Sequence, residues 1–284
     1  MLRSPRTLSH SLPRNLTTLR TAPAFPVRAD AVVVGAGPAG AATAYHLTRL
    51  GLPHVLLLDE RALPSCSNAP QGTAMVIPRL LSADSELVRL TRDLAFECLE
   101  ALPDLEPGVV KRPSILLATS PARALELEKL HATARYCGLP SQLLTPDTLS
   151  SHFPHIRIND LELALLLPDD AIFDPDQFSF AVAEAAARLG TQVHLGIPVQ
   201  EILMRNGKVK GVRTAQGIVH SSIVVCAAGT SSKDLCQTLG IELPFLTSSP
   251  WGAVASKTPQ EPLPSIVNID SSVSVAEHRG SLHL

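Results

Sequence analysis

The sequence has few aromatic residues and no paired cysteines. Phenylalanine, tyrosine and tryptophan make up 4% of the 284 residues, which leaves few rings to stack on the bases of single-stranded nucleic acid. The net charge of −2 provides no electrostatic attraction to nucleic acid. The five cysteines form no Cys-x-x-Cys pair, and an odd number without a framework argues against a disulfide scaffold. We therefore expect a protein of a reducing compartment with no nucleic-acid partner.

The chain also lacks a long apolar run, and its first 29 residues lack acidic side chains. No apolar run approaches the roughly 18 residues that a membrane-spanning helix needs, so we expect no transmembrane segment. Residues 1–29 contain five arginines and many serines, threonines and leucines. This composition is typical of an organellar targeting peptide, which we expect to be disordered. A mitochondrial address is the first choice, and a plastid address or a cytoplasmic protein with a basic tail is the alternative.

A glycine-rich turn follows an apolar run near the start of the chain. Residues 32–34 are valines and predict a buried strand, and Gly35, Gly37 and Gly40 follow with the spacing Gly-x-Gly-x-x-Gly. The first glycine permits a tight turn, the second lets the backbone approach a pyrophosphate, and the third lets the next helix pack closely on the strand. The N-terminus of that helix offers free N–H groups to phosphates. The pattern predicts a dinucleotide site.

An acidic residue ends the second apolar run. Residues 55–58 predict another strand, and Asp59 follows about 20 residues after the last glycine, where a carboxylate accepts hydrogen bonds from adenosine ribose hydroxyls. Glu60 is adjacent, and either acid fits the role of ribose partner. An acid at this position disfavours a 2′-phosphate, which argues against NADP.

The rest of the chain mixes strand and helix patterns. After the second strand, a loop rich in serine, asparagine, glutamine and glycine replaces the plain strand–helix unit of a nicotinamide-type Rossmann domain. Residues 222–228 form a continuous apolar run, closed by Gly229, of the kind that a parallel sheet buries on both faces. Because βαβ elements at both ends enclose a mixed middle stretch, we expect two interleaved domains.

Five stretches of the chain together carry a family resemblance. They are GAGPAGAATAYHL, LPDDAIFDPDQF, GTQVHLGIPVQEI, GKVKGVRTAQG and VVCAAGTSS. In this order and spacing the chain, from Ala29 to about Phe245, resembles the FAD-dependent oxidoreductases of the D-amino-acid oxidase, sarcosine oxidase and dimethylglycine dehydrogenase superfamily. The resemblance implies an α/β fold, in which a Rossmann-like FAD-binding domain with a parallel sheet plus antiparallel strands is interleaved with an α+β substrate domain. The implied FAD-binding domain comprises residues 30–90 and 168–243, and the implied substrate domain, expected to be incomplete, comprises 91–167 and 244–284.

The resemblance also implies which residues hold the cofactor, FAD. We expect non-covalent binding, because no histidine lies between Val55 and Leu130, where some relatives attach the flavin. Arg79 is a candidate for binding a substrate carboxylate, since a guanidinium grips it bidentately, although a surface arginine fits equally well. The implied cofactor-binding residues are Gly35, Gly37, Pro38, Ala39, Gly40, Asp59, Glu60, Ser67, Asn68, Gln71, Gly72, Thr73, Val199, Ala228 and Gly229.

The reaction that the resemblance implies is oxidation of a C–N bond. An amino acid or N-methylated amino acid would pass a hydride to the flavin, and the electron acceptor that follows is left open. The sequence assigns no catalytic residue. It assigns no metal either, because Pro154 interrupts helical geometry between His152 and His155. The alternatives are a catalytically incomplete flavoprotein with an assembly or regulatory role in the organelle, and a flavin reductase of isoprenoid chains, against which the PDDAIFDPDQF stretch speaks.

Overall fold

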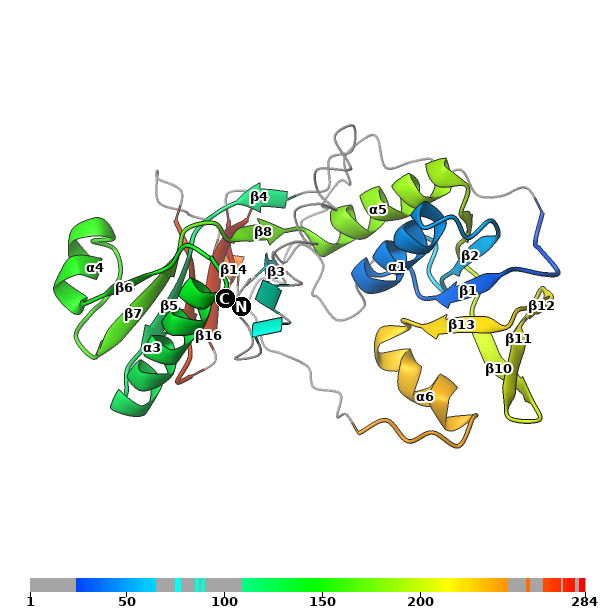
Figure 1. Cartoon of the computed structure of the whole chain (residues 1–284). Coiled ribbons are helices and arrows are strands. Elements are labelled where there is room, and N and C mark those ends of the chain that lie inside the picture. The colour runs from blue at the N-terminus through cyan, green and yellow to red at the C-terminus, as the bar shows by residue number, and fades with distance from the viewer. Residues whose placement is uncertain are drawn as a thin grey trace, which may run out of the picture. The chain divides into compact units, whose positions relative to one another are not determined.

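The chain divides into two compact units, each assembled from segments that are distant in sequence. The computed structural model describes residues 24–64, 75–77, 85–86, 88–89, 109–244, 254–255, 263–271, 273–278 and 281–283. The first unit comprises Met1–Gly72 and Asp176–Thr247, and the second comprises Thr73–Pro175 and Ser248–Leu284. Figure 1 labels the elements of both units.

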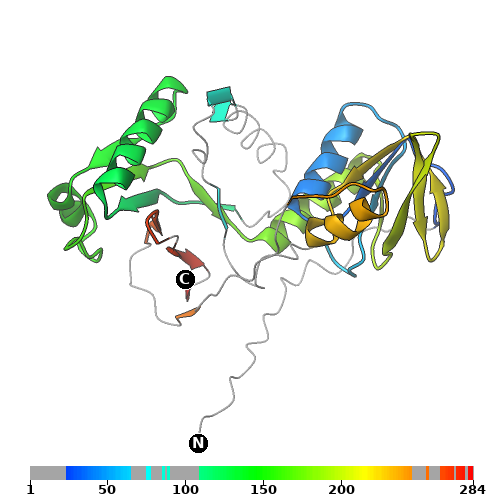
Figure 2. The same cartoon turned by 90° about the horizontal axis from the view of Figure 1, so that it is seen from below.

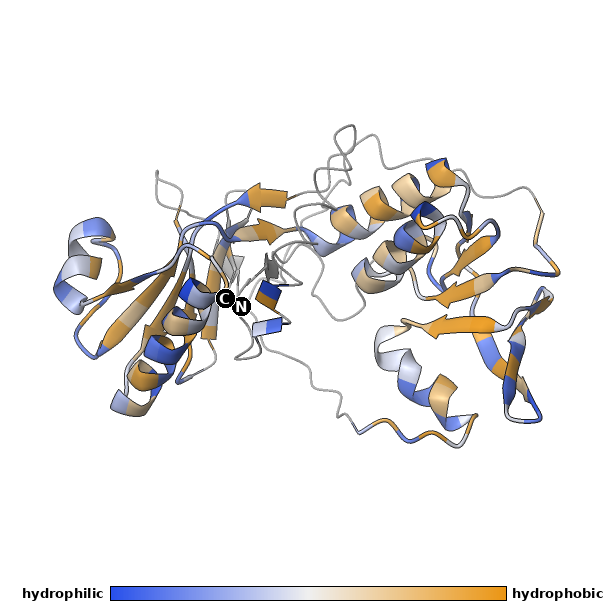
Figure 3. Ribbon diagram, in the orientation of Figure 1, coloured by the Kyte–Doolittle hydropathy of each residue, from blue (hydrophilic) through white to orange (hydrophobic). Residues whose placement is uncertain are grey.

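A parallel sheet forms the centre of the first unit. Its strands are β1 (Ala31–Val34), β2 (Val55–Leu58), β9 (Gln192–His194) and β13 (Ile223–Cys226), in the order β13-β1-β2-β9. Every residue of β1 and β2 is buried, because elements cover both faces of the sheet. Figure 3 shows β1, β2 and β13 in the hydrophobic colour. However, β13 lies at the edge of the sheet, where Ile223 is exposed and the other three residues are partly buried, so the expectation of a strand buried on both faces at 222–228 is wrong. The parallel α/β arrangement confirms the predicted fold class.

Two helices cover one side of this sheet. They are α1 (Pro38–Arg49) and α5 (Pro175–Leu189), which lie next to each other in Figure 1. The buried face of α1 consists mainly of small residues: Gly40, Ala41 and Ala44 are buried together with Tyr45. Small side chains on that face allow the helix to approach the strands closely, as the glycine pattern predicts.

An antiparallel sheet packs on the other side of the parallel sheet. Its strands are β10 (Val199–Arg205), β11 (Lys208–Thr214) and β12 (Gly217–His220), followed later in the chain by the 3-10 turn η1 (Gly229–Ser231) and helix α6 (Ser232–Gln237). Asn206 and Gly207 join β10 to β11 with φ values of 53° and 68°, as the sequence Asn-Gly predicts for a tight hairpin. Ile202, Val212 and Val219 belong to the hydrophobic cluster that also contains buried side chains of β1 and β2.

Residues 24–29 belong to the described part of the first unit. The Ala29 N–H donates to His220 O at 3.0 Å, and the His220 N–H donates to Val27 O at 2.9 Å, so this segment runs beside β12. Phe25 packs against the hydrophobic cluster of the two sheets, and Ala29 is buried. The sequence-based boundary, which places all of residues 1–29 in a disordered leader, therefore requires correction for residues 24–29. Composition gave no signal of these contacts, because they depend on a strand about 190 residues away.

A mixed sheet forms the second unit. Its order is β14-β17-β16-β15-β5-β7-β6, with strands β14 (Val254–Ala255), β17 (Ser281–His283), β16 (Val273–His278), β15 (Ser265–Asn268), β5 (Ser114–Ala118), β7 (Leu163–Leu167) and β6 (Gln142–Leu144). Helices α3 (Pro121–Tyr136) and α4 (Pro146–His152) cover its two faces, and Figures 1 and 2 show α3 lying along one of them. Ile115 and Leu117 cluster with Leu149 of α4, whereas Ala118 clusters with Leu127 of α3. This alternation has the period of two that a strand requires.

The C-terminal strands join this sheet through polar contacts as well as strand pairing. Strand β15 pairs in parallel with β5, and the Asp270 carboxylate that follows it accepts hydrogen bonds from the Thr119 N–H at 2.8 Å and the Ser120 hydroxyl at 2.6 Å. These two bonds lower the pKa of Asp270 below its ordinary value. The Arg112 guanidinium donates to Glu277 of β16 at 2.8 Å. The C-terminal segment is therefore an integral part of the sheet.

A small antiparallel sheet in the order β3-β8-β4 completes the second unit. Its strands are β3 (Met75–Ile77), β8 (Ala171–Phe173) and β4 (Val109–Lys111). Through this pairing, residues 73–90 and 168–175, which the sequence places in the FAD-binding domain, fall in the second unit. The assignment of cofactor and substrate binding to the two units stays a proposal.

Candidate nucleotide-binding site

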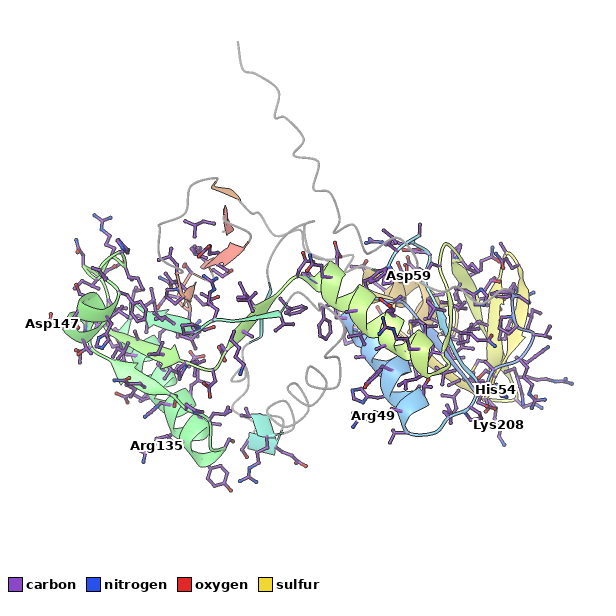
Figure 4. All side chains as sticks on the ribbon, turned by 90° about the horizontal axis from the view of Figure 1, so that it is seen from above. Arg49, His54, Asp59, Arg135, Asp147 and Lys208 are labelled. Carbon is purple, nitrogen blue, oxygen red and sulfur yellow. The ribbon has the colours of Figure 1, made fainter. Side chains whose placement is uncertain are left out.

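The carboxyl ends of the four parallel strands meet at one edge of the first unit's sheet. Helix α1 leads from β1 to β2 on one side, whereas β13 pairs with β1 on the other side, so the strand order reverses beside β1. Ligands of open α/β sheets bind outside the carboxyl ends at such a reversal. Figure 4 labels His54, just before β2, and Asp59, just after it, well apart from each other, and Asp59 lies at the carboxyl end of the strand.

A cavity of about 560 Å³ lies at this edge. It is lined by residues 34, 35 and 37–39 at and after the end of β1, residues 58–61 at and after the end of β2, residues 197, 199 and 200, residues 227–229 and 231 after β13, Asp234 and Leu235 of α6, and Thr238 just after α6. All of these segments belong to the first unit. The site therefore combines the start of the chain with a segment almost 200 residues later.

Two glycines of the turn are required by close backbone contacts. Gly35 has a φ of +104°, and a Cβ at this position would lie 2.3 Å from Ala227 O. A Cβ at Gly40 would lie 1.8 Å from Gly35 O. Real Cβ atoms do not approach backbone oxygens this closely, so any side chain here would displace the turn. The predicted structural roles of the first and third glycines match this geometry.

The N-terminus of α1 is open toward the cavity. Gly37 is the N-cap and, having no side chain, provides no capping acceptor; the first turn also contains no acidic residue. The first N–H groups of a helix need acceptors, and an anion can satisfy them with support from the helix dipole. Because Gly37, Pro38 and Ala39 all line the cavity, this end of α1 suits a phosphate group.

The Asp59 carboxylate fastens the glycine turn to the end of β2. It is 8% exposed, and one of its oxygens accepts a hydrogen bond from the Ala36 N–H at 2.6 Å while the other accepts from the Arg61 N–H at 2.8 Å. The neighbouring Glu60 side chain is exposed and lines the same cavity. Each carboxylate oxygen of Asp59 keeps a further lone pair with which to accept a ribose hydroxyl. This geometry favours Asp59 over Glu60 as the ribose partner.

Most of the sequence-predicted residues in the described part of the chain meet in this cavity. Gly40 does not line the cavity; its backbone packs directly against the backbone oxygen of Gly35. Those that line it are Gly35, Gly37, Pro38, Ala39, Asp59, Glu60, Val199, Ala228 and Gly229. Those that lie outside the described residues are Ser67, Asn68, Gln71, Gly72, Thr73 and Arg79. Sequence reasoning missed the wall formed by Asp234, Leu235 and Thr238, for which the only signal is that α6 directly follows the turn after β13.

His194 lies beside this edge of the sheet and provides a pH-dependent contribution to stability. It is buried, its ring stands edge-on to Phe25 at a centroid distance of 5.4 Å, and its Nε2 has no hydrogen-bond partner among the described residues. Burial lowers the pKa of His194 below its ordinary value, because the charged ring would lose solvation. The folded state therefore favours the neutral form of the His194 ring.

We expect stability to fall as the pH is lowered through the His194 titration. Above the unfolded-state pKa of about 6.5 both states hold a neutral ring, and below it the unfolded state binds a proton first, so the folded state loses stability as the pH falls toward the lower folded pKa. A His194→Gln variant removes this pH-dependent contribution to the unfolding free energy. Urea unfolding at several pH values between 7.5 and 5 should show a smaller loss of unfolding free energy in the variant, and equal slopes would contradict the assignment.

Neither a metal site nor a membrane-spanning helix is found among the described residues. No group of three or more histidine, cysteine, aspartate or glutamate side chains in the described ranges is arranged to hold a metal ion. His152 instead makes local contacts, with its Nδ1 2.8 Å from Thr148 O. Within the same ranges, no helix combines the length and apolar character needed to cross a membrane.

Comparison with known proteins identifies a family. The model of the family DAO, described as FAD dependent oxidoreductase, matches residues 30–280. The mitochondrial pyruvate dehydrogenase phosphatase regulatory subunit of Mus musculus is 26% identical over 269 residues, which is 91% of this chain and 30% of that protein. The formaldehyde-forming 4-methylaminobutanoate oxidase of Paenarthrobacter nicotinovorans is 30% identical over 240 residues, which is 84% of this chain and 29% of that protein.

Solved structures show the same fold. The L-amino acid deaminase from Proteus vulgaris, with its specific insertion deleted, superposes with a TM-score of 0.77 at 20% identity, over 96% of this chain and 72% of that one. The L-proline dehydrogenase from P. horikoshii superposes with a TM-score of 0.75 at 21% identity, over 91% of this chain and 70% of that one. The chain spans less than a third of the length of the two curated relatives described above.

Proposed function

The chain belongs to the DAO family of FAD-dependent oxidoreductases, and from this premise we propose that it oxidises an amino acid or N-methylated amino acid with FAD held in the cavity of the first unit. The family confirms FAD as the cofactor class. The observation that carries the proposal is the Asp59 carboxylate at the closed glycine turn. This carboxylate, a candidate ribose-binding group, accepts a hydrogen bond from the Ala36 N–H and so lies next to the N-terminus of α1, which suits a phosphate.

The residues of the cavity fit the two polar parts of the adenosine end. The N–H groups at the start of α1 would hold the diphosphate, and Asp59 would hold the ribose hydroxyls. Gly35 and Gly40 let the turn close, because a Cβ at either position would collide with a backbone oxygen of the protein. Gly229, after the turn from β13, has a φ of 57° and lines the opposite wall. We propose non-covalent binding by these contacts.

The proposed chemistry is oxidation of a C–N bond. Bound FAD would supply the acceptor for a hydride from the carbon next to nitrogen. One relative is a 4-methylaminobutanoate oxidase, and the structural neighbours include an L-proline dehydrogenase and an L-amino acid deaminase; these activities support an amine or amino-acid substrate. The role of this chain's own first unit is to bind and orient the cofactor through its adenosine end. Arg79 stays a proposal for the substrate carboxylate.

We also propose a mitochondrial location. Residues 1–29 have the arginine-rich, acid-free composition of a targeting peptide, and the similar phosphatase regulatory subunit of Mus musculus is mitochondrial. Since Phe25 and Ala29 pack in the folded unit, a cleaved leader would end before Phe25.

A visible absorption spectrum tests the proposed function. The full-length chain should purify with the yellow absorbance of flavin, and anaerobic addition of sarcosine, N-methylaminobutyrate or proline should bleach it. Denaturation should release the flavin into the filtrate if binding is non-covalent. A protein that is well folded by circular dichroism but binds no added FAD would refute the proposal.

One observation favours a second candidate, a flavoprotein with an assembly or regulatory role. A relative that matches 91% of this chain is named a regulatory subunit, that of pyruvate dehydrogenase phosphatase. The same spectrum distinguishes the two: flavin that binds tightly but is reduced by none of a panel of amino and N-methylamino acids supports the regulatory candidate. Reduction by any member of the panel supports the oxidoreductase.

A further inference from the structure

Four exposed cations of the first unit have no ion-pair partner among the described residues. They are Arg28, Arg205, Lys208 and Lys210. Arg213 of the same unit, in contrast, pairs with Glu201 at 3.0 Å. A cation that is already paired with a carboxylate has little attraction left for an external anion, whereas the four unpaired side chains keep theirs. The positions of these four on the fold therefore decide whether they form an anion-binding surface.

Backbone contacts bring the four cations together from two distant parts of the chain. Arg28 forms a β-bridge with His220 of β12. The residue after His220 donates its N–H to Lys210 O of β11 at 3.0 Å. Nearer the hairpin, Lys208 is the register partner of Arg205 in β10. The cations therefore form one continuous group across the end of the antiparallel sheet.

This group lies at the opposite end of the parallel strands from the cavity. The Asp30 N–H, just before β1, donates to His54 O, just before β2, at 2.8 Å. Asp30 O in turn accepts the hydroxyl of Ser221, whose N–H donates to β11, at 3.1 Å. Figure 4 accordingly labels His54 and Lys208 close to each other and apart from Asp59, which lines the cavity. A partner bound to the cations would therefore leave the cavity open.

Three segments carry these cations and form what we call the basic surface. They are residues 27–30, 204–210 and 220–223. Together they contain four arginine or lysine side chains and one histidine against a single acid, Asp30, which is half-buried. Exposed aliphatic side chains lie beside the cations, since Val27 is 71% exposed and Met204 is 48% exposed. The basic surface thus combines positive charge with accessible apolar area.

This combination favours an anionic lipid bilayer as the partner. Proteins bind the surface of such a bilayer with cations that meet the headgroup phosphates and with aliphatic side chains that enter the boundary with the acyl chains. Single-stranded nucleic acid fits less well, because the basic surface contains no aromatic residue on which a base could stack. An acidic protein would match the charge alone.

We propose that the basic surface docks the protein on an anionic phospholipid bilayer. The arginine and lysine side chains would donate hydrogen bonds to headgroup phosphates, while Val27 and Met204 would pack at the level of the first acyl carbons. Each basic residue near such a surface strengthens binding by about fivefold, so that four together contribute a factor on the order of several hundred. The attraction falls as salt is added, because it acts within about one Debye length. The proposal does not depend on FAD.

Cosedimentation with vesicles tests the proposal. The full-length chain should bind vesicles of phosphatidylcholine and cardiolipin but not vesicles of phosphatidylcholine alone, and binding should fall between about 0.1 M and about 1 M salt. The double variant Lys208→Gln/Lys210→Gln should bind at least about tenfold more weakly. The control Lys129→Gln/Arg213→Gln removes the same charge from exposed positions outside the basic surface and should bind within about twofold of the unchanged chain. Circular dichroism of both variants establishes that they fold.

Hydrogen exchange of the full-length chain locates the contact. Residues 1–23 contain four further arginines that also attract anionic lipid, so the protected peptides, rather than binding alone, identify the site. Bound cardiolipin vesicles should slow exchange in peptides that cover 204–210 and 220–223. Peptides that cover 34–39, at the cavity, should exchange as they do without vesicles.

Three results would overturn the proposal. The first is protection confined to residues 1–23, and the second is equal binding of cardiolipin vesicles by Lys208→Gln/Lys210→Gln and the unchanged chain. The third is binding of heparin or polyglutamate without binding of vesicles, which assigns the basic surface to an acidic macromolecule instead of a bilayer.

Discussion

A Gly35→Ala variant is expected to lose measurable FAD binding, with affinity falling by at least about 100-fold. The new Cβ would lie 2.3 Å from Ala227 O, and the residue would have to keep a φ of +104°. The backbone conformation alone costs an L-residue about 1–2 kcal/mol, and the clash forces the turn after β1 away from the turn after β13. Because these two turns form facing walls of the cavity, the ligand site is lost with them. Fluorescence titration of the apoprotein with FAD measures the effect.

Gly51→Ala is the matched control for this prediction. Gly51 has a comparable φ of +93°, but among the described residues no atom lies within 4 Å of a Cβ placed there. The substitution should therefore cost about 1–2 kcal/mol of unfolding free energy from backbone strain and leave the affinity for FAD unchanged. If Gly35→Ala and Gly51→Ala bind FAD equally well, the close approach of the turns does not shape the site.

The parts of this site that the sequence predicts are those with local signals. The buried strands at the two apolar runs, the turn at Gly35 and the Asn206-Gly207 hairpin each depend on neighbouring residues, and the structure has all of them. The parallel sheet also follows from local evidence, since continuous apolar strands require cover on both faces. Local patterns thus account for the fold class and for the first half of the cavity.

The remaining features depend on contacts between distant segments. Phe25 packs against His194, and Leu235 reaches the cavity only because β13 pairs with β1. A composition-based boundary at residue 29 cannot detect the first contact, and a short polar helix gives no sign of the second. The choice between Asp59 and Glu60 is of the same kind, because which of two adjacent acids faces inward is decided by the register of β2 against its neighbours.

Asp59→Asn is expected to weaken FAD binding by about 10- to 100-fold, which corresponds to about 1.5–3 kcal/mol for losing a hydrogen bond to a charged group. The carboxylate accepts the Ala36 N–H and the Arg61 N–H on separate oxygens. An asparagine has one acceptor oxygen, so its amide would face one of these N–H groups with another donor. The glycine turn would lose an anchor at the same time as the ribose loses its partner.

Glu60→Gln separates this prediction from a general effect of removing negative charge. Both substitutions remove one charge from the same cavity wall, but Glu60 is exposed, whereas Asp59 is 8% exposed and bonded on both oxygens. We expect Glu60→Gln to change FAD affinity less than about threefold, since exposed charges interact weakly through water. Urea unfolding of the two apoproteins should show a loss only for Asp59→Asn, through its contacts with the turn. If Glu60→Gln instead loses affinity for FAD and Asp59→Asn retains it, then Glu60 binds the ribose and Asp59 only holds the glycine turn in place.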